Sequence, residues 1–160
     1  LILATRPFKV GDYIDAGGHS GTVEGIQILY TDLVTVDNKV IRIPNGALSN
    51  ASIVNYSEKP TRRVDFTFGA GYEADAQKVV TVLTEIVTGH PLTLKDPEPF
   101  VRMSQHADSA VNYTVRVWVN AADYWTVHFD VIEQVKQRFD AEGLSIPFPQ
   151  MDVHLHQLKA

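Results

Sequence analysis

The stretch "VIRIPNGALSNASIVNYS", Val40–Ser57, is the most informative part of this chain. It begins as a strand, stops at Pro44-Asn45-Gly46, continues through small polar residues and ends as a second short strand. Proline cannot donate to a strand ladder, asparagine tolerates left-handed backbone and bonds its own backbone, and glycine frees the chain to reverse. We therefore expect a tight turn at this point, with a strand that stops abruptly before it.

The residues around this stretch predict a small β domain. The five expected strands are Val10–Ala16, Thr22–Tyr30, Leu33–Val36, Val40–Ile43 and Ser52–Tyr56. Asp37-Asn38-Lys39 suits a hairpin turn, and Gly25 inside a strand indicates a bulge or a sharp bend. Five short, strongly bent strands in so few residues predict a barrel of SH3-like or Sm-like type.

The pattern changes near Lys59-Pro60 to one that mixes strands and helices. The expected elements are strand Arg63–Phe68, helix Ala74–Thr88, strands Phe100–Gln105 and Val111–Val119, and a helix that Asp123 caps and Gly143 ends. The side chains expected to be buried on the helices are Val79, Val80, Leu83, Ile86, Val87, Val127, Val131, Ile132, Val135 and Phe139. This order of elements predicts a ferredoxin-like α/β domain.

The last residues, Met151–Gln157, alternate like a strand. One side carries Met151, Val153 and Leu155, and the other carries Asp152, His154 and His156. The segment could be the last strand of the α/β sheet, but Pro147 and Pro149 also allow it to leave that sheet. Both alternatives remain open at this point.

Composition bounds the class of protein. The 160 residues suffice for one large domain or two small ones, and 44% hydrophobic residues allow a packed core. A net charge of −5 disfavours nonspecific binding to nucleic acid, and the absence of cysteine excludes disulfides and thiolate chemistry. Leu1–Thr5 is too short to span a membrane, so with Arg6-Pro7 it is either a ragged terminus or the cut end of an apolar helix.

No catalytic motif stands out, so we do not expect an enzyme. Gly17-Gly18-x-x-Gly21 and Gly69-Ala70-Gly71 lack the spacing of phosphate-binding loops. His154 and His156 share a face, but two ligands are too few for a closed zinc site within one chain. We therefore expect no cofactor and no bound metal.

Three quoted segments carry a resemblance to a known family. "RPFKVGDYIDAGGHSGTVEGIQILYT", "VIRIPNGALSNASIVNYS" and "PFPQMDVHLH" are similar to the cytoplasmic part of small-conductance mechanosensitive (MscS-type) channels. The resemblance covers nearly the whole chain in order. Its most specific part is a Gly-x-Val followed by Ile-Pro-Asn, here Gly21, Val23, Ile43, Pro44 and Asn45, with Gly46 next.

The resemblance implies a layout in three parts. Residues 1–60 would hold the end of a pore helix and the Sm-like β domain, residues 61–150 the α/β domain, and residues 151–160 an oligomerisation strand. Seven copies would form a hollow vestibule, and Met151, Val153 and Leu155 would face the inside of a parallel intersubunit barrel. The six residues named above, Gly21, Val23, Ile43, Pro44, Asn45 and Gly46, would lie at the junction between subunits.

The resemblance also implies a function and a location. The complete protein would open under membrane tension and release ions and small solutes after osmotic downshock, attached to a bacterial or archaeal inner membrane through helices absent from this chain. The alternative is a soluble Sm-like oligomer that binds nucleic acid or protein. Lys9, Lys39 and Arg42 are too sparse for the basic face that nucleic acid requires, so we expect no nucleic acid as a partner.

Overall fold

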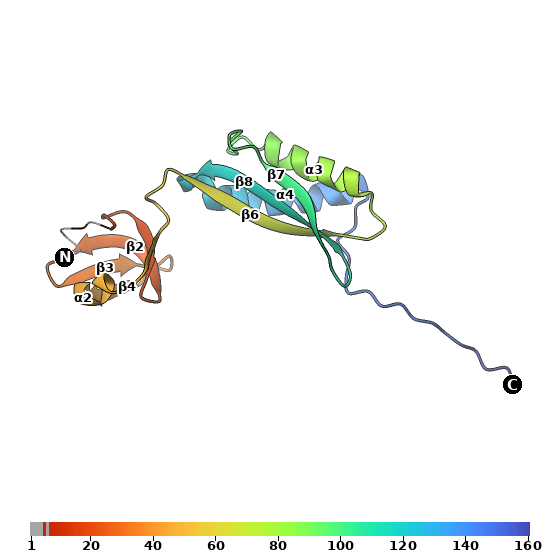
Figure 1. Ribbon diagram of the computed structural model, residues 1–160, viewed down its shortest axis with the longest axis horizontal. Coiled ribbons are helices and arrows are strands. Elements are labelled where there is room, and N and C mark those ends of the chain that lie inside the picture. Colours follow the sequence, from red (N-terminus) through yellow and green to blue (C-terminus); the bar gives the residue numbers. More distant parts are fainter. Residues whose placement is uncertain (1–4, 6) are drawn as a thin grey trace. The chain divides into compact units, whose positions relative to one another are not determined.

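The structure is a computed structural model that describes Thr5 and residues 7–160. The expected helix end at Leu1–Thr5 and Arg6 therefore lies, apart from Thr5, outside the described residues. The chain forms two compact units, Leu1–Pro60 and Thr61–Ala160, which we call the first and second unit (Figure 1).

The first unit is a five-stranded antiparallel sheet with the strand order β4-β3-β2-β1-β5. Its elements are β1 (Tyr13–Ala16), β2 (His19–Ile26), β3 (Tyr30–Val34), β4 (Val40–Pro44), the short helix α2 (Asn45–Ser49) and β5 (Ile53–Asn55). No ladder joins β4 to β5 in the described part of the chain, so both strands are edges of an open sheet.

One predicted strand of the first unit is wrong. Thr22–Tyr30 is not continuous, because β2 ends at Ile26 and a turn follows in which the Gln27 N–H donates to the Tyr30 carbonyl at 2.7 Å. Apolar residues continue the strand pattern through this turn, yet Ile28 and Leu29 are 85% and 69% exposed. The expected irregularity at Gly25 is confirmed, since the register between β2 and β3 shifts between Val23 and Gly25.

The hairpin between β3 and β4 is confirmed. Asn38 has a left-handed φ of 67°, which asparagine tolerates better than most residues. The Thr35 N–H donates to the Lys39 carbonyl at 2.8 Å and closes the loop. The register runs from Val34 opposite Val40 to Tyr30 opposite Pro44, so β4 pairs along its whole length on this side.

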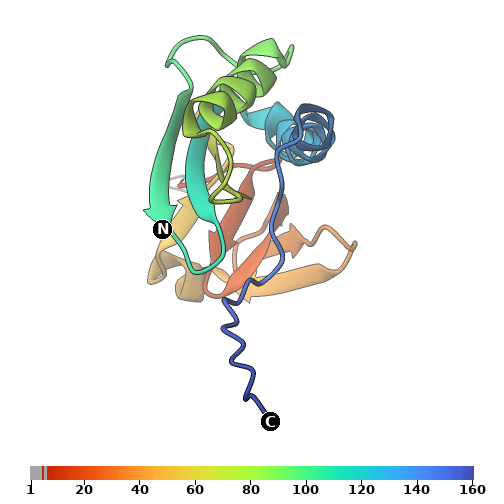
Figure 2. The same ribbon diagram turned by 90° about the vertical axis from the view of Figure 1, so that its right-hand side faces the viewer.

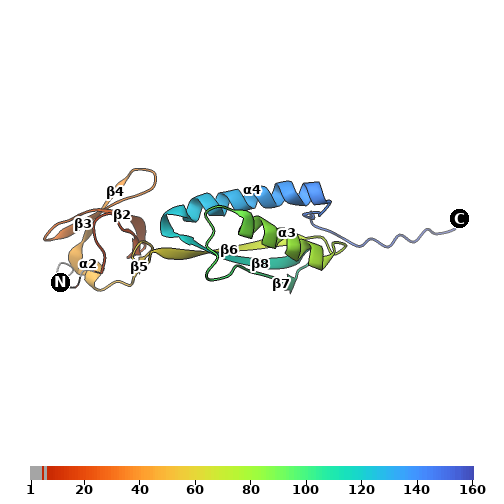
Figure 3. The same ribbon diagram turned by 90° about the horizontal axis from the view of Figure 1, so that it is seen from above.

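The second unit is a two-layer α/β structure. A three-stranded antiparallel sheet has the order β6-β8-β7, and α3 and α4 pack on one of its faces (Figure 2). The two helices run side by side (Figure 3). The elements are β6 (Thr61–Ala70), α3 (Ala76–Gly89), β7 (Phe100–His106), β8 (Val111–Asn120), the 3₁₀ turn η1 (Ala121–Asp123) and α4 (Tyr124–Glu142).

This element order matches the expected β-α-β-β-α plan, with some differences in the helices. Val82 is buried on α3 although it was not expected, and Ile132 on α4 is 42% exposed although it was expected in the core. Asp123 precedes α4 but makes no side-chain cap, whereas Gly143 ends α4 with a left-handed φ of 70°, as expected.

The C-terminal segment does not join the sheet of its own unit. The structure contains no strand in residues 144–160, and the segment extends away from the helices (Figure 1). Pro147 and Pro149 have no N–H to donate, and the Gln150 N–H instead donates to the Ser109 hydroxyl at 3.0 Å. The alternative that Met151–Gln157 is the last strand of this sheet is therefore wrong, and the outer edge of β6 has no partner among the described residues.

Candidate functional site

The Pro-Asn-Gly stop at the end of β4 is built differently from the expected turn. Pro44 is the last residue of β4, and Asn45 and Gly46 begin α2 with no left-handed backbone. Asn45 does not use the left-handed backbone that asparagine tolerates, and its side-chain amide bonds other residues instead of its own backbone, so a short helix stands where a tight turn was expected. The chain leaves the sheet through this helix and not through a tight turn. The first turn of α2 follows directly after Pro44, which is its N-cap residue.

The Asn45 side chain holds the loop between β2 and β3. Its amide nitrogen donates to the Gln27 and Ile28 carbonyls at 2.7 and 3.0 Å, and its carbonyl oxygen accepts from the Thr31 hydroxyl at 2.7 Å. The Asn45 backbone N–H also donates to the Leu29 carbonyl at 2.8 Å. Because Thr31 is fully buried, its hydroxyl depends on Asn45 as its acceptor. Asn45 therefore fixes both the end of β4 and the shape of the neighbouring loop.

Gly21 and Val23 support the sheet from within β2. A Cβ atom at Gly21 would lie 2.8 Å from the Val34 carbonyl oxygen, so only glycine fits this approach between β2 and β3. Val23 is buried in the core of the first unit together with Ile43. Strand β3 lies between β2 and β4, so the structure does not bring Gly21 into contact with the Pro-Asn stop along the ladder.

The outer edge of β4 has backbone N–H and C=O groups that pair with no strand among the described residues. Within the described residues, β4 pairs only with β3, and Ile43 turns its side chain into the core. Arg42 points outward and makes two hydrogen bonds to Asp32 at 2.8 and 3.0 Å. These bonds lower the pKa of Asp32 below its ordinary value of 3.8. The edge thus offers unpaired N–H and C=O groups beside a neutralised cross-strand pair.

Sequence reasoning missed an apolar tip next to this edge. Ile28 and Leu29 are largely exposed, and Tyr30 is partly exposed at the start of β3. The Asn45 bonds to the Gln27 and Ile28 carbonyls hold this tip in place. The signal in the sequence was an apolar pair directly before an expected strand end, which composition alone could not distinguish from a buried strand.

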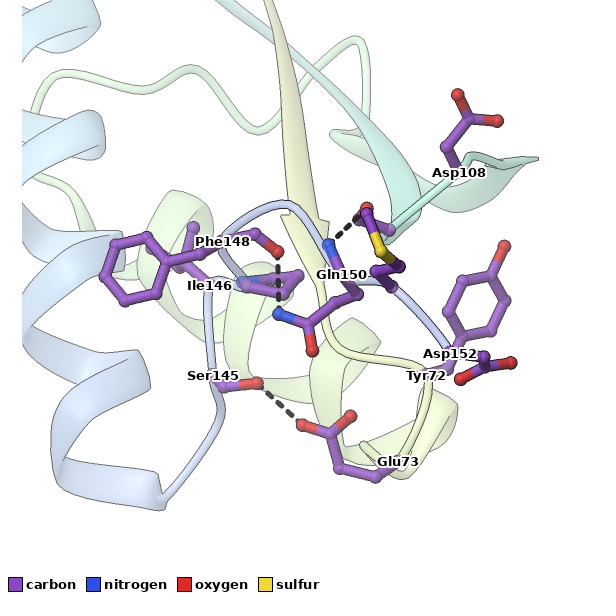
Figure 4. A pocket seen from close by; sticks show the side chains of 11 residues that line it. Tyr72, Glu73, Asp108, Ser145, Ile146, Phe148, Gln150 and Asp152 are labelled. Carbon is purple, nitrogen blue, oxygen red and sulfur yellow. Dashed lines mark hydrogen bonds between the residues drawn. The ribbon is translucent and has the colours of Figure 1, made fainter. Parts of the chain in front are cut away.

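The C-terminal segment leaves the second unit through a cleft (Figure 4). The cleft is lined by Tyr72 and Glu73, by Asp108 and Ser109, and by residues of the chain between Ser145 and Asp152. The Ser145 hydroxyl donates to the Glu73 carboxylate at 2.6 Å, which lowers the pKa of Glu73 below its ordinary value of 4.5. The Gly71 N–H donates to the Ser145 carbonyl at 3.1 Å. These two bonds hold the chain at Ser145, before the exposed C-terminal segment begins.

Beyond the cleft, the expected barrel residues are exposed. Met151, Val153 and Leu155 are 84%, 65% and 88% exposed, and no element of the described chain covers them. In an extended chain their side chains share one side. The structure therefore presents an apolar face that no other described residue covers.

The described part of the chain offers little for catalysis. It contains no group of three or more His, Cys, Asp or Glu side chains that could hold a metal ion. His90, the buried histidine, contacts the Asp130 carboxylate at 2.7 Å through Nε2, and its Nδ1 accepts from the Leu92 N–H at 3.1 Å. Because Nδ1 is an acceptor, Nε2 is the nitrogen that donates to Asp130. This pair ties the end of α3 to α4 and is a structural contact.

No helix in the described residues is long and apolar enough to cross a membrane. The candidate sites are the edge of β4 with its Asn45 anchor, and the exposed C-terminal segment.

Two family profiles match the chain. The profile described as "Mechanosensitive ion channel, beta-domain" matches residues 1–58, and "Mechanosensitive ion channel MscS, C-terminal" matches residues 64–146. The two matches follow the division into two units.

Individual relatives agree with these profiles. A small-conductance mechanosensitive channel of Edwardsiella ictaluri is 45% identical over 98% of this chain and 55% of its own length. A small-conductance mechanosensitive channel of Methanocaldococcus jannaschii is 33% identical over 98% of this chain and 46% of its own length. The crystal structure of Helicobacter pylori MscS in the closed state has a TM-score of 0.92 at 28% identity, over 98% of this chain and 62% of that one. The chain spans about half the length of the curated relatives that it matches.

Proposed function

Because this chain belongs to the MscS family of mechanosensitive ion channels, a family of channels and not of enzymes, we propose that it forms the cytoplasmic vestibule of such a channel. The complete protein would carry membrane helices, open under tension and release ions and small solutes on osmotic downshock. It would lie in the inner membrane of a bacterium or an archaeon. One observation carries the proposal: both channel domains match in order, and the match to the closed-state channel structure covers 98% of this chain and 62% of that one.

We propose that copies of the first unit assemble through their two open edges. Strands β4 and β5 lie at opposite ends of the strand order, so an edge of one copy is free to pair with a different edge of the next. Such head-to-tail contacts close into a ring when the rotation between copies is right. Pro44 limits the pairing of β4, because it has no N–H. In this arrangement, Sm-like barrel closure would be completed between copies.

We propose that the C-terminal segments close the bottom of the ring. Seven parallel copies of residues 151–157 would form a barrel whose interior is only wide enough for side chains. Met151, Val153 and Leu155 would fill it, and Asp152, His154 and His156 would face water. Their present exposure supports this role, because burying three large apolar side chains in each copy stabilises assembly by several kcal/mol per chain, at roughly 1.5–3 kcal/mol for each side chain.

The first test is the mass and shape of the purified chain. Light scattering is expected to give about seven times 17.8 kDa, and electron-microscope images are expected to show a hollow ring. A version that ends at Gln150 is expected to lose the ring while keeping the thermal unfolding of the second unit. A monomer at high concentration, or an intact ring without residues 151–160, would contradict the proposed assembly.

The second test uses the complete protein in its membrane. Expression in a bacterial strain without its own mechanosensitive channels is expected to restore survival after osmotic downshock, and patch-clamp recording is expected to show tension-gated currents. Absence of both, with the protein present in the membrane, would contradict the channel function. This test does not depend on whether the isolated chain assembles.

A further inference from the structure

The sheet of the second unit has one covered face and one open face. Helices α3 and α4 both pack on the same side of β6, β8 and β7 (Figure 2). On β8, the residues of the covered face from Val111 to Val119 are buried, while those between them are partly exposed. No helix of the second unit covers the other side of this sheet.

In the second unit, the strands of the sheet are mainly basic, and the helices and loops are mainly acidic. The strands carry four basic residues and one acidic residue, which are Arg62, Arg63, Arg102, Arg116 and Asp65. The rest of residues 61–160 carries five basic and twelve acidic residues. A basic sheet in an otherwise acidic unit is not required for packing, because three of the four arginines, all except Arg62, lie on the face away from the core.

The register between β7 and β8 places Arg102 and Arg116 diagonally across from each other on neighbouring strands. Phe100 is opposite Arg116, and Arg102 is opposite Thr114. Val101 opposite Val115 points into the core, so the other four side chains share the open face. We call this group of four, Phe100, Arg102, Thr114 and Arg116, the arginine cell. Diagonal residues on neighbouring strands lie about 7–8 Å apart, so two guanidinium groups can reach one ligand between them.

Among the described residues, Arg102 and Arg116 have no salt bridge to an acidic side chain. The carboxylate nearest in register, Asp65 on β6, is held by Arg63 through hydrogen bonds of 2.7 and 2.9 Å. Arg116 lies over the Phe100 ring, with its guanidinium carbon 5.2 Å from the ring centroid. The Arg116 Nε is buried and has no hydrogen-bond acceptor within the described chain. A buried donor without an acceptor is costly, and an oxyanion would supply one.

We propose that the arginine cell binds a small oxyanion, a carboxylate or a phosphate. Guanidinium groups match the paired oxygens of both anions and hold them more tightly than a spherical ion. Thr114 adds a hydroxyl to the same cell, and the Phe100 ring lies within cation–π distance of the Arg116 guanidinium. The acidic surplus elsewhere in the unit opposes binding of a large polyanion, which would have to cross it. The site belongs to one copy of the chain and does not depend on ring formation.

The test is protection of Arg102 against an arginine-specific reagent. The full chain is treated with phenylglyoxal in a cationic buffer, and modification of each arginine is followed by mass spectrometry. Acetate and phosphate are titrated separately against sodium chloride at equal ionic strength. We expect saturable protection of Arg102 by at least one oxyanion and none by chloride, with Arg42 in the first unit unaffected. The anion that protects at the lower concentration identifies the class of ligand.

Two variants decide whether the cell acts as a unit. Arg116→Gln is expected to raise the concentration that half-protects Arg102 about fivefold, the factor that corresponds to about 1 kcal/mol for one exposed ion pair. Asp65→Asn is expected to lower that concentration, because it removes the neighbouring negative charge. Arg138→Gln, which changes the charge equally on α4, is the matched control and is expected to have no effect. Equal protection by chloride, or an unchanged value in Arg116→Gln, would overturn the proposal.

Discussion

The two units bury very different amounts of apolar surface. The second unit has 18 buried side chains in one cluster between its sheet and two helices. The described residues of the first unit include seven buried side chains, under a sheet whose two edges are open. A domain of about 60 residues is close to the lower limit for independent stability, whereas one of about 100 residues is not. We therefore expect the second unit to fold alone and the first unit to depend on contacts with other copies.

The largest expected effect tests the self-sufficient core of the second unit. Val117 is fully buried in the middle of β8, so Val117→Asp places an unpaired carboxylate in the core. The cost is several kcal/mol, roughly the stability of a whole domain. Circular dichroism is expected to show loss of the helices at ambient temperature.

Thr114→Asp is the matched control for this prediction, because it adds the same charge to the open face of the same strand. It is expected to leave the helices intact. If Val117→Asp melts at the parent temperature, the assignment of the covered face is wrong.

The next effect tests how tightly the smaller sheet is packed. Gly21→Ala pushes a methyl group to 2.8 Å from the Val34 carbonyl oxygen and is expected to destabilise the first unit by about 1–3 kcal/mol. Gly46→Ala is the matched control, since its Cβ meets nothing within 4 Å and its backbone is helical. It is expected to be neutral or to stabilise by up to about 1 kcal/mol. Urea unfolding of both variants measures the difference, and equal effects would show that Gly21 is not needed for close approach.

An effect of similar size tests whether Asn45 acts through its hydrogen bond with Thr31. Asn45→Ala leaves the buried Thr31 hydroxyl without its acceptor and is expected to cost about 1–3 kcal/mol. In the Thr31→Val background, the same substitution is expected to cost less, because the unsatisfied hydroxyl is gone. A double-mutant cycle by urea unfolding gives the coupling. Additive effects would mean that Asn45 acts only through the loop carbonyls of Gln27 and Ile28.

The smallest effect compares one carboxylate in each unit. The pKa of Asp32 is lowered mainly by its hydrogen bond to Arg42, and the pKa of Glu73 is lowered mainly by its hydrogen bond to Ser145. Both bonds stabilise the fold above the unfolded pKa, near 3.8 and 4.5, and this contribution is lost as the pH falls through the lower folded values.

Carbon NMR titration checks this comparison directly. Arg42→Gln is expected to raise the pKa of Asp32 toward 3.8, while Asp37, whose pKa is lowered mainly by Thr35, stays unchanged. Added salt is expected to raise the pKa of Asp32 more than that of Glu73, because only Asp32 pairs with a cation. An equal response to salt would mean that charge contributes little to the Asp32 pair.

The sequence was sufficient where one periodicity dominated. Strict alternation identified β8, and helical spacing identified α3 and α4, because each of these elements has one buried face. Sequence-based prediction of burial failed at Ile28, Leu29 and Ile132, which are apolar but exposed. The hydropathy of a residue does not say whether another part of the protein covers its side chain.

The site was harder to predict than the fold for a related reason. The motif at Pro44-Asn45-Gly46 was recognised, but the Asn45 bonds reach residues 14 to 18 positions earlier in the chain. The arginine cell depends on the register between β7 and β8, which shifts by a bulge between Met103 and Gln105. Neither long-range bonds nor register can be obtained from local spacing.

The exposed C-terminal segment has a consequence for the life of a newly made subunit. A single copy carries an extended apolar segment that no described element of its own fold covers, and extended, exposed segments are preferred sites of proteolysis. Assembly would hide this segment, so a surplus or damaged copy that finds no partners would remain open to degradation. We expect this turnover of unassembled copies to keep the number of complete particles in balance.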